Sequence, residues 1–159
     1  MKKISVLLIA IFITARLSAQ TIQKLSIQQL THWIDTSTTP LVVNFWASWC
    51  APCVREIPWF EKNMAKFSDK KVKLLLVSLD FADEYPDGIL AFSRKQHYQS
   101  TIVWLNESNP DSFCPKIDKS WDGTIPVSLF VNNAKKYRQF FKQQLPEPRL
   151  EQELQKLVQ

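Results

Sequence analysis

The stretch Leu41-Val-Val-Asn-Phe-Trp-Ala-Ser-Trp-Cys-Ala-Pro-Cys53 decides the fold of this chain. Its first half, as far as Trp46, is an apolar run typical of a buried strand, and its second half carries Cys50 and Cys53, separated by two residues. A helix that begins at such a pair stabilises a thiolate, because its first turn has partial positive charge and unpaired backbone N–H groups. Pro52 fits this turn, which needs no N–H from it. The pair can therefore close a disulfide and open it again. A static disulfide and half of a zinc site are the alternatives, and the strand, the proline and the preceding tryptophan favour the redox pair.

The residues from Phe45 to Cys53, followed by Glu56-Ile57-Pro58, resemble the active-site signature of the TlpA/ResA-like branch of the thioredoxin superfamily. Members of this branch are extracytoplasmic thiol–disulfide oxidoreductases. The resemblance implies that Cys50, nearer the helix end, attacks a substrate disulfide and that Cys53 resolves the mixed disulfide. It also implies that Trp49 lies beside the site and shapes it, with an ordinary core position as the alternative.

An acid near the second thiol is expected from the same resemblance. Thioredoxins similar to this chain have a buried Asp at the strand position that Asn44 occupies here, and an amide cannot accept a proton from a thiol. Glu56 lies three residues after Cys53, on the same face of a helix, and is the nearest replacement. In the TlpA/ResA-like pattern an acid at this position tunes the thiols and relays a proton. The alternative is an exposed acid that merely suits the start of a helix.

A second segment, Thr124-Ile125-Pro126-Val127, precedes an apolar strand. In the superfamily the proline at this position is preceded by a cis peptide bond and faces the cysteine pair. Its neighbour, here Ile125, offers backbone groups to an extended substrate segment in the manner of strand addition. The resemblance therefore implies a substrate-binding set formed by Trp49, Ala51, Pro52, Ile125 and Pro126.

The start of the chain has the pattern of an export signal. Met1-Lys2-Lys3 is a positive segment, and Ile4 to Ala15 is an apolar run shorter than the about 20 residues that span a bilayer. Cleavage after Ala19 divides the chain into a signal peptide, 1–19, and a thioredoxin-like domain, 20–159. We therefore expect an exported, periplasmic or extracytoplasmic protein with no stable membrane anchor, and an uncleaved anchor is the alternative.

Composition narrows the classes of partner. The formal charge of +5 falls to +2 when the three cations Lys2, Lys3 and Arg16 are removed with the leader, which gives no electrostatic case for nucleic acid. His32 and His97 fall in separate expected helices without ligand spacing, so we expect no metal and no cofactor.

Cys114 is the odd cysteine of the three in the chain. It falls within Phe113-Cys114-Pro115, and no fourth cysteine pairs with it. A free cysteine of this kind is most simply a buried apolar residue, and a redox role is the alternative.

The order of elements predicts an α/β protein with a thioredoxin-like fold, a central mixed sheet flanked by helices. The sequence adds an N-terminal extension and a central insertion from about Asp80 to Trp121. The first expected helix follows Ser26, because Ser26 and Gln29 have capping-box spacing. The second runs from the cysteines to about residue 67, and three more are expected over 87–98, 110–119 and 147–158. Expected strands are 41–46, 72–79, 101–105, 127–131 and 136–141, the last two forming a hairpin across Asn132-Asn133 because Asn tolerates positive φ.

The function that these features favour is exchange of the Cys50/Cys53 dithiol with disulfides of client proteins, chiefly as a reductant, with an upstream thiol electron donor. The alternative is a copper- or other metal-delivery module on the same fold, using the cysteines as soft ligands. Copper carriers on this fold usually separate their cysteines by three residues and add a downstream His, and this chain has neither feature. A peroxidase of the peroxiredoxin type lacks its threonine-proline-cysteine environment here.

Overall fold

The computed structural model describes residues 21–159, and the expected signal peptide lies outside them. None of the helices in this described part is both long enough and apolar enough to cross a membrane. The elements in chain order are β1 (Gln23–Leu25), α1 (Ile27–Thr36), β2 (Leu41–Trp46), α2 (Ala51–Lys66), β3 (Lys73–Ser78), α3 (Asp87–Lys95), β4 (Thr101–Leu105), α4 (Pro110–Ile117), β5 (Val127–Asn132), β6 (Tyr137–Phe141) and α5 (Glu147–Val158). Short 3-10 helices cover Ser68–Lys70, Ala82–Glu84 and Asn133–Lys135.

The strands form one mixed sheet in the order β1-β4-β3-β2-β5-β6. The strand β2 pairs in parallel with β3, so that Trp46 lies opposite Ser78, and antiparallel with β5, so that Asn44 lies opposite Ser128. Because β2 and β3 are parallel, their carboxyl ends meet at the same edge of the sheet. The loop that carries Cys50 and the loop that follows β3 therefore emerge side by side.

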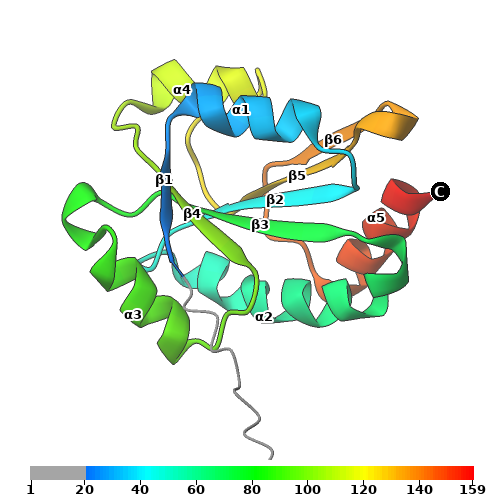
Figure 1. Ribbon diagram of the computed structural model, residues 1–159, viewed down its shortest axis with the longest axis horizontal. Helices are drawn as coiled ribbons and strands as arrows, with labels where there is room; N and C mark the ends of the chain where they lie inside the picture. Colours follow the sequence, from blue (N-terminus) through cyan, green and yellow to red (C-terminus); the bar gives the residue numbers. More distant parts are fainter. Residues whose placement is uncertain (1–20) are drawn as a thin grey trace, which may run out of the picture.

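Helices cover both faces of this sheet, α1 and α4 on one and α2, α3 and α5 on the other (Figure 1). The alternation of side chains along β2 supplies both cores. Val42 and Trp46 pack on the side of α2, in the cluster that contains the two cysteines, whereas Val43 and Phe45 pack on the side of α1 and α4. A strand buried on both faces reads as a continuous apolar run, which is why the sequence of β2 shows no polar alternation.

These observations confirm the thioredoxin-like α/β fold and most of the expected elements. The capping box is present: the Ser26 side chain accepts from the Gln29 N–H, and the Gln29 side chain accepts from the Ser26 N–H. The helix expected over 87–98 ends earlier, at Lys95, and His97 follows with a φ of 58°.

One element was not predicted, and one local prediction needs correction. The N-terminal extension contains a strand, β1, that pairs in parallel with β4; its three residues are too few to show a period-two pattern. The β5–β6 connection is a 3-10 turn in which Lys136, with a φ of 54°, has the left-handed conformation expected for an Asn. Asn133 instead donates its side-chain amide to the carbonyls of Ile34 and Ser37, which fastens the turn to α1.

Candidate active site

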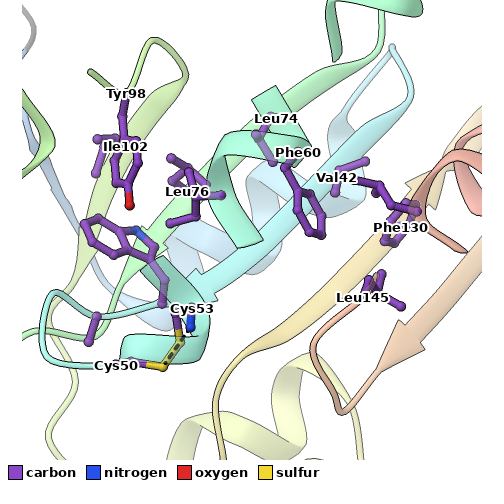
Figure 2. Packing of buried hydrophobic residues seen from close by; sticks show 14 of the residues in the cluster. Val42, Cys50, Cys53, Phe60, Leu74, Leu76, Tyr98, Ile102, Phe130 and Leu145 are labelled. Carbon is purple, nitrogen blue, oxygen red and sulfur yellow. Dashed lines mark hydrogen bonds between the residues drawn. A yellow bond between two sulfur atoms is a disulfide. The ribbon is translucent and has the colours of Figure 1, made fainter. Parts of the chain in front are cut away.

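The two expected redox cysteines form a disulfide at the N-terminus of α2. Cys50 is the N-cap residue, and its Sγ accepts a hydrogen bond from the Cys53 N–H at 3.3 Å. Cys53 is completely buried in the core cluster under α2, while Cys50 retains 5% exposure at its rim. Figure 2 shows the disulfide at one end of this cluster, with Leu76 and Phe60 further inside. Of the two cysteines, only Cys50 therefore has any access to solvent.

The loop between β2 and α2 is held by a carboxylate that the sequence analysis missed. Asp80, 4% exposed, follows β3 and accepts both the backbone N–H and the hydroxyl of Ser48 on Oδ1, at 2.9 and 2.6 Å. Its Oδ2 accepts the Ser78 hydroxyl at 2.7 Å, and its carbonyl accepts the Trp104 indole N–H at 2.8 Å. The signal that could have found Asp80 is a polar residue that follows a parallel strand, at the same sheet edge as the cysteine loop.

Glu56 is fully buried, so the exposed-acid alternative is wrong. Its Oε1 accepts the Asn44 side-chain amide at 2.7 Å, and its Oε2 accepts the Leu145 backbone N–H at 3.0 Å. The Asn44 amide also donates to the Ser128 hydroxyl at 3.0 Å. The structure thus brings together Asn44 and Glu56, the two positions that the sequence comparison linked.

Burial raises the pKa of Glu56 from 4.5 to about 7, and the hydrogen bonds from Asn44 and Leu145 offset part of that rise. A carboxyl with this pKa gains and loses a proton near neutral pH. The Asn44 Oδ1 atom, which is buried, has no hydrogen-bond partner among the described residues. A protonated Glu56 could donate to that oxygen if the Asn44 amide turned over, so the pair can accommodate either protonation state.

The segment between β6 and α5 closes over the first turns of α2. Leu145 donates its N–H to Glu56 and accepts the indole N–H of Trp59 on its carbonyl at 2.9 Å. Gln144 donates its side-chain amide to the Pro52 carbonyl at 2.9 Å. These bonds to α2 shield Glu56 from water, which explains its burial by a segment about 90 residues away in sequence.

Trp49 is not a core residue: its side chain is 56% exposed, so the core alternative is wrong. Its ring stacks on that of Phe81, 67% exposed, with centroids 6.0 Å apart and planes at 21°. Both rings line a cavity of about 510 Å³ between the loops after β2, β3 and β4. The cavity is lined by Trp49, Leu79, Asp80, Phe81, Ala82, Trp104, Asn106, Glu107, Ser108, Pro110, Phe113, Gly123 and Ile125.

The remaining expected substrate-binding residues lie around the same end of the sheet. Ile125 is half-buried and lines the cavity, Pro126 is buried, and the peptide bond between them is cis, the isomer that the resemblance implied. Ala51 is exposed and Pro52 half-buried at the start of α2. Their role in binding stays a prediction.

Cys114 is buried in the opposite core, between α4 and the sheet, as a free thiol. Burial, reinforced by the nearby Asp111 and Asp122 carboxylates, raises the pKa of this thiol to about 11. A thiol with this pKa holds its proton at neutral pH, which makes it a poor nucleophile. His32 and His97 are both exposed, on α1 and after α3.

Comparison with known proteins places these features in a family. The model of the AhpC/TSA family matches residues 14–137. A curated relative, the thiol-disulfide oxidoreductase ResA of Oceanobacillus iheyensis, is 35% identical over a match that covers 37% of this chain and 39% of the relative. Thioredoxin 1 of Chlorobaculum tepidum is 34% identical over 41% of this chain and 60% of its own length. The matches therefore span 39% and 60% of the lengths of these two relatives, less than two thirds of either.

Solved structures with the same fold include a thioredoxin-related protein from Neisseria meningitidis serogroup B, with a TM-score of 0.64 and 22% identity over 76% of this chain and 86% of that one. A DsbE-type thiol:disulfide interchange protein from Chlorobium tepidum gives a TM-score of 0.62 at 22% identity, covering 79% of this chain and 84% of its own. At this identity the likeness establishes the thioredoxin fold alone.

Proposed function

This chain belongs to the AhpC/TSA family, and on that premise we propose that it is a thiol–disulfide oxidoreductase that exchanges a Cys50/Cys53 dithiol with disulfides of client proteins. The observation that carries the proposal is the geometry of the pair. One sulfur sits at the rim of a helix N-terminus, the second is buried behind it, and the two are close enough to be bonded. Similarity to ResA over the matched segment supports the same chemistry.

The reaction proceeds in two displacements. The Cys50 thiolate attacks one sulfur of the client disulfide, so that the client S–S bond breaks and its other sulfur leaves as a thiolate. The Cys53 thiolate then attacks Cys50 Sγ, which releases the second client sulfur and closes the Cys50–Cys53 disulfide. Two electrons pass to the client, and the two protons of the original dithiol end on its thiols. The backbone N–H of Cys53, which points at Cys50 Sγ, favours the negative charge that Cys50 carries when it attacks.

Glu56 is the proposed proton acceptor for Cys53. Both residues are completely buried and lie one turn apart on α2, so bulk water has no direct access to the Cys53 proton. A carboxyl whose pKa is about 7 can accept that proton at neutral pH and release it again.

The client lies along the end of the sheet that carries the disulfide. Trp49, Ala51 and Pro52 are close neighbours of Cys50 in the chain, and Ile125 and Pro126 directly precede β5. Ile125 packs against the cluster that contains both cysteines. The proposed direction is reduction of client disulfides in an exported, extracytoplasmic setting, supplied by an upstream thiol donor. Resemblance of the 1–19 segment to a signal peptide supports this setting.

Single-cysteine variants test the assignment. With insulin as the client, Cys53→Ser should accumulate a mixed disulfide through Cys50, because attack remains and resolution is lost. Cys50→Ser should trap nothing and reduce nothing, and Cys114→Ala serves as the matched control. A trap formed by Cys50→Ser but not by Cys53→Ser would reverse the two roles.

Two further measurements test the direction and the reaction class. Equilibration with glutathione of known redox ratio gives the potential: a pair more reducing than glutathione fits a reductant, and a more oxidising pair contradicts that direction. Tight binding of Cu(I) by the reduced protein would indicate a metal carrier instead. Rapid oxidation of the dithiol by hydrogen peroxide would indicate a peroxidase.

A further inference from the structure

Two aromatic side chains stand out on the surface of the molecule. Among residues 21–159, the large apolar side chains classed as exposed are those of Trp49 and Phe81. They come from different loops, after β2 and after β3, yet their rings stack on each other at the mouth of one cavity. Trp49 is bonded directly to Cys50, so the aromatic pair is continuous with the redox site.

Exposure of two stacked rings is unfavourable in water unless something covers them. Aromatic side chains around a pocket are also the residues that most often carry binding energy in protein interfaces. The cavity behind the pair, about 510 Å³, falls within the range of about 300–1,000 Å³ typical of binding pockets. Trp104 and Phe113 extend its apolar lining inward. Its size and lining fit a large apolar side chain together with a short stretch of backbone.

The charged side chains that line the cavity are acidic. Its charged lining residues are Asp80 and Glu107, with no Lys or Arg among them. Asp83 and Glu84 are exposed two and three residues after Phe81, outside the cavity lining, and the Glu84 carboxylate lies against Gly88 on α3. The Asp80 carboxylate is occupied by Ser48 and Ser78, so Glu107 is the lining acid that is left to meet an incoming group. The ring of Trp104 already has a cation, the Lys24 ammonium, 5.3 Å from its centroid.

We propose that this cavity, with Trp49 and Phe81 as its aromatic rim, binds a client segment in which a large apolar side chain and a Lys or Arg lie next to the reacting cysteine. The inference rests on the proposed thiol–disulfide exchange and names the class of client sequence that the site selects. The apolar side chain enters the cavity, and the cation lies against Glu107. The neighbouring client sulfur is thereby presented to Cys50 Sγ, which displaces the other client sulfur as in the reaction above.

The test measures how fast the reduced protein reduces short peptides. Each probe is a symmetric disulfide dimer, so that attack on either sulfur is equivalent, with Lys-Trp-Cys, Lys-Ala-Cys or Glu-Trp-Cys at its centre. The protein variants are Phe81→Ala, which removes an exposed ring, and Glu107→Gln, which keeps an acceptor for the Ile27 N–H that Glu107 Oε1 binds. Glu151→Gln, on α5, is the charge-matched control. Reaction with dithiothreitol-size disulfides reports intrinsic thiol chemistry in every variant.

We expect the wild-type protein to reduce the Lys-Trp-Cys probe about tenfold faster than the Lys-Ala-Cys probe, and Phe81→Ala to abolish that preference. Glu107→Gln should reduce the preference for Lys-Trp-Cys over Glu-Trp-Cys about two- to fivefold, more so at low salt, with Glu151→Gln unchanged. Equal rates for all probes in a protein that still reduces them would overturn the cavity assignment and leave the exchange reaction standing. Failure to reduce any probe or small disulfide would overturn the proposed function itself. A dimer in solution that Phe81→Ala converts to monomer would show that a second copy of this chain covers the rings, and would also overturn the client assignment.

Discussion

Replacing Glu56 by Gln isolates the energetic consequence of burying a carboxyl beneath the redox pair. Glu56 is completely buried, and burial raises its pKa from 4.5 to about 7. The folded protein therefore holds the proton more tightly than the unfolded chain, and rising pH costs stability. This contribution is fully present below about pH 4.5 and is lost as pH rises through about 7.

The size of the effect follows from the two pKa values. Each tenfold change in proton affinity corresponds to about 1.4 kcal/mol, so wild-type stability should fall by about 3 kcal/mol across this window. Gln carries no titrating proton and should lack this component. The variant also loses one acceptor, because Asn44 and Leu145 both donate to the carboxylate, at a cost of about 1–3 kcal/mol. That cost is the same at every pH and cancels when two pH values are compared.

Urea unfolding of the oxidised protein measures this difference, because the disulfide removes Cys50 and Cys53 from the titration. The free energy of unfolding of Glu56→Gln, minus that of wild type, should be about 3 kcal/mol larger at about pH 8.5 than at about pH 4, because only the wild type loses stability as pH rises. Glu151→Gln, which removes an exposed carboxylate paired with Lys66, should change by less than about 1 kcal/mol. Parallel pH profiles for wild type and Glu56→Gln would refute the reasoning and mean that folding does not raise the pKa of Glu56.

Three further outcomes follow from the same structure. In the reduced protein, Glu56→Gln should lower the pH at which the thiols begin to react rapidly with iodoacetamide, because the carboxylate near Cys53 opposes a second negative charge. Superimposable alkylation profiles would contradict the proposed role of Glu56 as proton acceptor for Cys53. Cys114→Ala should leave the redox potential and insulin turnover unchanged and lower the free energy of unfolding by about 1 kcal/mol, and a large loss of activity in a folded variant would give Cys114 a redox role. Asp80→Ala leaves two Ser48 donors without their acceptor, so it should destabilise the protein by about 1–3 kcal/mol and slow reduction of protein disulfides. Asp80→Asn keeps an acceptor oxygen and should restore both stability and rate. An Asn variant as impaired as the Ala variant would show that the charge of Asp80, not the position of the loop, causes the effect.

Features encoded by neighbouring residues were predictable. The continuous apolar run of β2, the capping box before α1 and the cysteine pair at the start of α2 each depend on spacing within one element, and each was found from the sequence. Glu56 belongs to this class too, since its position one turn beyond Cys53 follows from helical geometry. The burial of Glu56 could not be predicted in this way, because the segment that shields it contains Leu145, about 90 residues further along the chain.

Features that depend on pairing between distant strands were not predictable. β1 has three residues and no pattern of its own, and it is a strand only because β4 offers it an edge. Asp80 and Phe81 lie about 30 residues after the cysteine loop, and no local signal connects them to it. They reach Ser48 and Trp49 because β2 and β3 pair in parallel and end at the same edge.

The sequence by itself therefore determined the redox pair, the acid that accompanies it and the class of fold, because helical and strand periodicities are properties of consecutive residues. Only the tertiary structure decided that Trp49 is exposed, that Asp80 holds the loop in front of Cys50, and that Glu56 is dry enough for its pKa to reach about 7. The physical reason is that exposure, desolvation and hydrogen-bond partners are set by which distant segments pack together. That packing minimises the free energy of the whole chain, so the residues of a single segment do not determine it.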